Sequence, residues 1–140
     1  MIPPKVQDAL RKLLSDNAGE NALGAKLVPA LSPQELPVLL DLLKQEAEHH
    51  PDRHAPVGAL HKLGIQKIPG AAAMLIEVAR SIPPDSLDPS VPQNIAELAQ
   101  HEAQLRQPTV DVLKQLASHD KAKAGKAATK ALETLQKKAK

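Results

Sequence analysis

Four prolines divide this sequence into units that repeat one apolar pattern. Pro4, Pro37, Pro69 and Pro108 are separated by 33, 32 and 39 residues, and a helical pattern begins at each of them, as is common for proline at a helix start. Apolar side chains recur two and five positions after each proline: Val6 and Ala9, Leu39 and Leu42, Ala71 and Met74, Val110 and Leu113. No stretch alternates as a strand does. The pattern predicts an all-α protein in which one amphipathic helix is written four times.

Local signals give the expected helix boundaries. Ser32 is predicted to cap a helix and to form a capping box with Glu35. Ser90, two residues before Pro92, is predicted to cap a second helix in the same way. We expect eight helices, at residues 4–15, 20–31, 33–48, 55–63, 69–80, 92–106, 108–118 and 120–138. Proline excludes a helix from the stretch SIPPDSLDPSVPQ, where Ile82 and Leu87 are candidates to dock on a neighbouring surface. The alternative, which we favour, is a plain connector.

Each proline-led helix is followed by a polar turn and a second helix rich in small residues. A helix pair that recurs about every 30 to 45 residues is typical of a stacked α-solenoid, in which no pair buries its apolar face alone. We therefore expect residues 1–140 to form a single domain of about four stacked helix pairs. The alternative is a compact, non-repetitive helical bundle whose prolines merely start helices.

Composition excludes several kinds of site. The chain has no cysteine, hence no disulfide, thiolate metal site or cysteine nucleophile, and no aromatic residue, hence no base stacking. Its scattered glycines form no phosphate loop, and no G-x-S-x-G elbow is present. We expect a protein that is not an enzyme and binds no cofactor. The aromatic-free composition also fits an engineered scaffold without a native ligand.

Hydropathy gives no sign of a membrane segment. The longest apolar run, residues 71–76, is far too short to span a bilayer, and the opening residues lack the apolar segment of a secretory signal. A soluble, cytoplasmic protein is the expectation.

Two stretches resemble a known repeat family. VDVLKQLASHDKAKAGKAATKALETL is similar to an armadillo or HEAT-type repeat, and HAPVGALHKLGIQKIPGAAAMLIEVA to the junction between two such repeats. The resemblance implies a curved, right-handed superhelical stack with a binding role. Thr134 and Lys62 replace the asparagine that peptide-binding armadillo repeats often carry, and tryptophan is missing. The importin-like capture of basic peptides is therefore not expected.

The first functional hypothesis is a non-catalytic protein–protein interaction module whose partner is an unknown protein or peptide. Its ligand is expected on the concave face formed by the second helices of the pairs. The contact residues predicted there are Lys26, His61, Lys62, Gln100, Gln104 and Lys130.

Lysines at the end of the chain support a second hypothesis, nucleic-acid binding. Residues 1–107 carry a net charge of −3, whereas residues 108–140 carry eight lysines and three acids, a net charge of +5. The candidate phosphate contacts are Lys121, Lys123, Lys126 and Lys130. The alternative is a solubilising cap, because the last repeat of a stack needs a polar outer face. An apolar stripe that includes Ala128 and Leu135 already predicts a packed helix here and not a loose tail.

The histidine-rich stretch EHHPDRH is a candidate metal site. His49, His50 and His54 carry neutral imidazoles, which are good ligands for zinc. However, Pro51 imposes an extended kink, and no pair has the four-residue spacing of a helical zinc motif. A solvated turn between two helices is the alternative interpretation.

Overall fold

The computed structural model describes residues 2–138, and in this range the chain forms helices joined by turns and short connections, without strands. The predicted all-α class is confirmed. None of the described helices is long and apolar enough to cross a bilayer. The eight α-helices and two 3-10 turns are α1 (Pro4–Leu13), α2 (Ala18–Leu27), η1 (Val28–Ala30), α3 (Glu35–His49), α4 (Ala55–Ile65), α5 (Ala71–Ser81), α6 (Val91–His101), η2 (Ala103–Leu105), α7 (Arg106–Ala117) and α8 (Lys123–Lys138).

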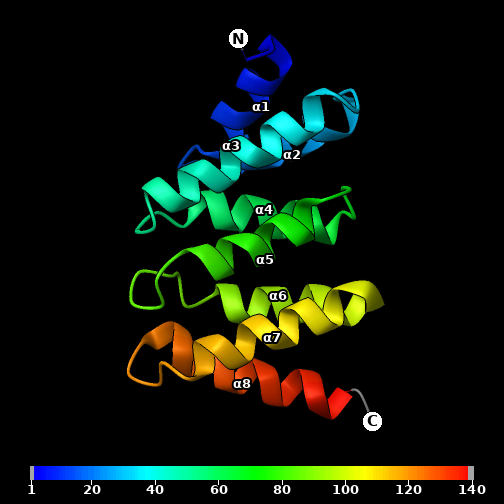
Figure 1. The fold of residues 1–140 in the computed structure, drawn as a ribbon. Coiled ribbons are helices and arrows are strands. Elements are labelled where there is room, and N and C mark those ends of the chain that lie inside the picture. The colour runs from blue at the N-terminus through cyan, green and yellow to red at the C-terminus, as the bar shows by residue number, and fades with distance from the viewer. Residues whose placement is uncertain (1, 139–140) are drawn as a thin grey trace.

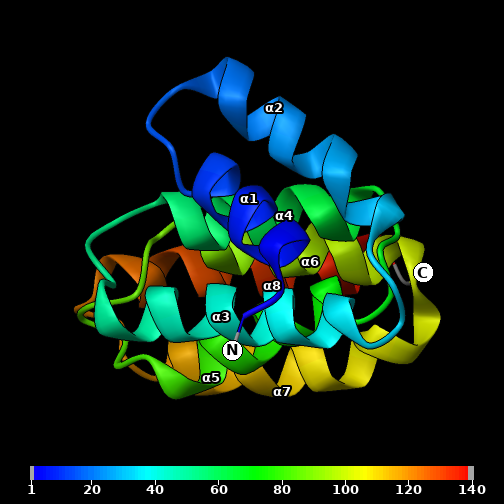
Figure 2. The ribbon, with the colours of Figure 1, turned by 90° about the horizontal axis from the view of Figure 1, so that it is seen from above.

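The helices follow one another from one end of the molecule to the other (Figure 1). Each helix from α3 to α6 contacts the next helix but one, so that α3, α5 and α7 form one row while α4, α6 and α8 form a second. Figure 2 shows these two rows side by side, with α1 and α2 lying across one end. At this end α1 packs against α2 and α3. α2 makes most of its contacts with α1 and η1, and fewer with α4.

One cluster of buried apolar side chains extends from Val6 on α1 to Leu135 on α8. It contains leucine, isoleucine, valine and alanine but no aromatic ring. The core is therefore filled by helices that pack closely together, and not by large side chains. On α8 the fully buried positions include Ala124, Ala128 and Ala131. Their small side chains allow α8 to lie close to α6 and α7, which it contacts extensively.

Most helix boundaries differ from the prediction by a few residues, and two of the differences have a local explanation. α2 begins at Ala18, because the Asn17 side chain caps it by accepting a hydrogen bond from the Glu20 backbone N–H at 3.1 Å. The segment predicted as one helix over 92–106 is interrupted at Glu102, whose extended backbone (φ −136°, ψ 101°) ends α6. α7 therefore starts at Arg106, and Pro108 lies in its first turn instead of opening it.

The capping box before α3 is confirmed. The Glu35 backbone N–H donates to Ser32 Oγ at 3.1 Å, and the Ser32 N–H donates to Glu35 Oε1 at 2.8 Å. The hydrogen bond from the Ser32 backbone lowers the pKa of Glu35. The same logic was wrong for Ser90, whose side chain makes no cap. Its N–H and hydroxyl both donate to Asp88 Oδ1 instead, at 2.9 and 2.7 Å.

The proline-rich connection between α5 and α6 is anchored by apolar side chains. Ile82 and Leu87 are both buried in the core cluster. The connection is thereby part of the packed fold. The exclusion of helix from this stretch was wrong at its end, because α6 begins at Val91 and tolerates Pro92 in its first turn.

The turn between α4 and α5 requires two left-handed residues, Lys67 (φ 62°) and Gly70 (φ 86°). Lys67 ends α4 in a Schellman arrangement, because the Ile68 N–H donates to the Leu63 carbonyl and the Lys67 N–H to that of Gly64, both at 3.0 Å. A residue with a Cβ is strained in this conformation, whereas glycine is not.

Replacing Lys67 with glycine is expected to stabilise the protein by up to about 1 kcal/mol, because the strain of the left-handed backbone is relieved. Urea unfolding followed by circular dichroism measures the change. Lys67→Ala is the matched control: it removes the same side chain but keeps the Cβ, so no gain is expected. Equal stability of the two variants would contradict this explanation.

Candidate functional site

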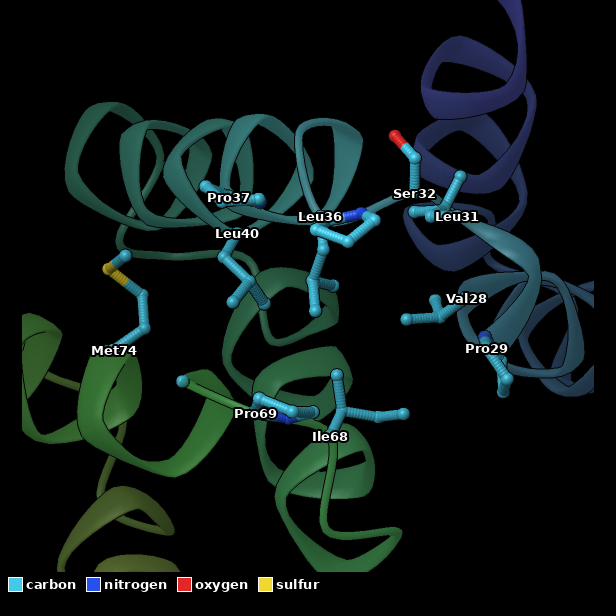
Figure 3. Close-up of a pocket in the computed structure, with 12 residues that line it drawn as sticks. Val28, Pro29, Leu31, Ser32, Leu36, Pro37, Leu40, Ile68, Pro69 and Met74 are labelled. Carbon is cyan, nitrogen blue, oxygen red and sulfur yellow. The ribbon is translucent and has the colours of Figure 1, made fainter.

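An apolar cleft opens where the end of α2, the start of α3 and the turn between α4 and α5 meet (Figure 3). Its volume is about 610 Å³, within the range of about 300–1,000 Å³ that is usual for ligand pockets. In Figure 3, Leu36 and Leu40 extend from α3 toward Ile68 and Pro69 on the facing turn. The lining residues are Val28, Pro29, Leu31, Ser32, Pro33, Leu36, Pro37, Leu40, Ile68, Pro69, Gly70 and Met74.

Chain-breaking residues shape this cleft. Pro29 lies in η1 at the end of α2, and extended backbone at Leu31 (ψ 145°) leads to the capping box that starts α3. On the other side, the left-handed turn at Lys67 and Gly70 holds Ile68 and Pro69 beside α3. A Cβ on Gly70 would lie 3.3 Å from Leu40 Cδ1, so this turn approaches α3 closely.

The chemistry of the cleft is uniform. Four of its residues are prolines, which contribute rigid apolar rings and no N–H donor. Its one polar side chain, Ser32, is occupied by the capping box. Val28 and Leu40 are buried, while Leu36, Ile68 and Met74 are half-buried and expose part of their apolar surface. The cleft therefore suits apolar groups and contains no titratable side chain.

Two smaller cavities continue along the same edge of the molecule. One, of about 280 Å³, shares Ile68, Pro69 and Gly70 with the cleft and reaches Gln104. The other, of about 260 Å³, includes Ile65, Glu97 and His101, and both contain Lys67 and Glu102. Along this edge the surface is therefore apolar at the cleft and carries charged side chains of both signs near the end of α6.

The six residues predicted to contact a partner lie outside the cleft. Lys26, Gln104 and Lys130 are exposed, while His61, Lys62 and Gln100 are half-buried. Of these, Gln104 lines the cavity of about 280 Å³. His61 Nε2 is 3.6 Å from Glu97 Oε2 and has no hydrogen-bond partner.

The histidine stretch is spread over the connection from α3 to α4. His49 is the last residue of α3, His50 follows it, and His54 precedes α4, all three being exposed. His54 Nδ1 bonds to Asp88 Oδ2 at 2.7 Å. In residues 2–138 no three His, Asp or Glu side chains are grouped so that they could hold a metal ion.

The His54 contact belongs to a network around Asp88. Burial raises the pKa of this carboxyl, but hydrogen bonds from Ser90 and His54 outweigh it, and the pKa is lowered overall. The charged carboxylate thus ties the proline-rich connection to the start of α4. The contact between His54 and Asp88 therefore has a structural role, because it joins two segments of the fold.

The candidate phosphate contacts divide into two groups. Lys121 and Lys123 line a polar cavity of about 510 Å³ together with Asp52, Asp85 and Asp88. Lys126 and Lys130 lie further along α8, and all four lysines are exposed. The apolar stripe predicted for this segment is buried at Ala128 and Leu135 among other positions.

Sequence reasoning missed the cleft. Pro37 and Pro69 were interpreted only as helix starts, although they line a shared surface with residues from two other segments. Proline beside aliphatic residues at Val28–Pro29, Leu36–Pro37 and Ile68–Pro69 was the available signal. This pairing marks apolar residues near helix ends, but it does not indicate which of these segments lie next to one another in the fold.

Comparison of the chain with protein-family models, curated proteins and solved structures finds no match. The eight-helix fold is compatible with a helical repeat. The resemblance to armadillo and HEAT repeats therefore rests on the sequence pattern and the helical fold alone.

Proposed function

We propose that this chain is a short α-solenoid of armadillo or HEAT type and that it serves as a non-catalytic protein-interaction module. The two rows of helices support the solenoid, because each helix in a row contacts the next one, as expected when repeats stack on their neighbours. The binding site we assign is the apolar cleft, in place of the residues suggested by the sequence.

The apolar cleft carries the proposal. It leaves half-buried aliphatic groups from α3, α5 and the turn between α4 and α5 in contact with water, and burial of such surface is favourable by about 25 cal/mol per Å². A partner segment with aliphatic side chains fits this site. The lining offers no general acid, base or activated nucleophile. Binding without catalysis is the function that such a site supports.

A selection from random peptides tests this proposal. The purified protein is used to select from a phage-displayed library of random dodecapeptides, and selected peptides are measured by fluorescence anisotropy. We expect enrichment of peptides with closely spaced aliphatic residues. The double variant Leu36→Gln, Met74→Gln places two amides in the cleft and should weaken these peptides at least about tenfold, since buried apolar contact is lost.

The matched control is Leu23→Gln, which makes the same kind of change at a side chain 51% exposed on α2, outside the cleft. It should leave the affinity unchanged. Failure to enrich any peptide, or equal binding of the selected peptides by the double variant and the wild-type protein, would show that the cleft is not a peptide site.

A further inference from the structure

The outer side of α8 carries a row of unpaired lysines. Lys123, Lys126 and Lys130 are exposed, and their spacing of three and four residues places them on one helix face. The buried stripe of Ala124, Ala128, Ala131 and Leu135 occupies another face of the same helix. Within the part of the chain that the structure describes, none of the three lysines forms an ion pair.

This face lies at the end of the molecule. α8 packs on α6 and α7, and Figure 1 shows it as the last helix of the series, opposite α1. At 1.5 Å per residue, Lys123 and Lys130 are separated by about 10 Å along the helix axis. Glu133 is exposed on the same face, one helical turn from Lys130. Lys123 lines the polar cavity together with Asp52, Asp85 and Asp88, whereas Lys126 and Lys130 do not line it. Lys126 thus occupies the middle of the lysine face.

We propose that this lysine face binds the phosphate backbone of double-stranded nucleic acid, independently of sequence. Charge complementarity supports a polyanion, because residues 108–136, whose side chains the structure describes, carry five lysines against three acids, a net charge of +2. The site is separate from the apolar cleft, so the two proposals succeed or fail independently.

Two observations favour a duplex over other polyanions. Proteins that bind single strands stack bases on aromatic side chains, and this chain has none. Helices that lie on membranes insert an apolar face, but the apolar stripe of α8 is buried in the protein's own core. Duplex phosphates require neither stacking nor insertion. Lysine, a flexible point charge, meets them without reading bases.

The test uses the full chain and a fluorescein-labelled duplex DNA of twenty base pairs, titrated at several KCl concentrations between about 50 and 200 mM. We expect binding that weakens linearly on a log–log plot against salt. Each single change, Lys123→Gln, Lys126→Gln or Lys130→Gln, should reduce the magnitude of the slope by about 0.9, since one phosphate contact is lost. The triple variant should bind at least about tenfold more weakly at the lowest salt.

A second triple variant, Lys5→Gln, Lys44→Gln and Lys67→Gln, removes the same net charge from α1, α3 and the turn between α4 and α5, and should retain the binding and its slope. The single-stranded form of the same DNA and vesicles containing phosphatidylserine are compared with the duplex. Tighter binding of the single strand, binding of vesicles alone, equal loss in both triple variants, or no binding at low salt would each overturn the proposal. The last result would leave α8 as a solubilising cap.

Discussion

Replacing Gly125 with alanine is expected to destabilise the protein by more than about 3 kcal/mol, at the upper end of what overpacking costs. A Cβ built on Gly125 would overlap the backbone carbonyl oxygen of His119 and would lie 2.7 Å from its carbon and 2.9 Å from the Leu116 oxygen. These are backbone atoms at the end of α7 and in the turn that follows, so no side-chain rotation relieves the overlap. Urea unfolding measures the loss, and a change below about 1 kcal/mol would contradict this close approach.

Gly58→Ala is the matched control, because it adds the same methyl group within a helix. A Cβ at Gly58 would lie 2.9 Å from Nε2 of His54, whose side chain is 62% exposed and can turn away. Alanine favours a helix over glycine by about 0.5–1 kcal/mol, which offsets the weakened contact between His54 and Asp88. The stability of Gly58→Ala should stay within about 1 kcal/mol of the wild-type value.

The helical class and most helix positions were predictable because they depend on local spacing. The repeated apolar positions after the prolines are buried at Val6, Leu39 and Ala71, and the Ser32–Glu35 box is formed by residues three apart. Such interactions are contained within one or two turns of chain. A single sequence displays them directly.

The break at Glu102 was not predictable in the same way. The stretch NIAELAQHEAQL keeps helical spacing through this residue and contains neither glycine nor proline. Its backbone is nevertheless extended at Glu102, and Leu105 after it is buried in the core. Tertiary packing here overrides local propensity, which is a weak preference.

The cleft depends on contacts between segments distant in sequence. Val28, Leu36, Ile68 and Met74 belong to four different stretches, and nothing in the spacing of any one of them indicates the others. The lysine face, in contrast, lies on one helix, and its exposure follows from the apolar stripe of that helix. Surface built from a single element was predictable, but surface built from several was not.

Leu75→Ala is expected to cost about 3–4 kcal/mol, as large-to-small changes in well-packed cores do. Leu75 is fully buried on α5, which contacts α3, α4, α6 and α7. Because the core has no aromatic side chain, leucines supply much of its buried volume, and small neighbours such as Ala72 and Ala79 leave little to fill a cavity. Leu75→Met nearly conserves volume and should cost less than about 1.5 kcal/mol.

Met74, which precedes Leu75 in the sequence, lies at the boundary between the core and the cleft. Met74 is half-buried and lines the cleft, whereas Leu75 next to it on the helix is inaccessible to solvent. Met74→Ala should therefore lose less than half of the stability lost in Leu75→Ala, because part of the methionine surface is already in water. Urea unfolding of both variants makes the comparison. Equal losses would mean that Met74 is as deeply packed as Leu75, and the cleft would then have no methionine surface to offer a partner.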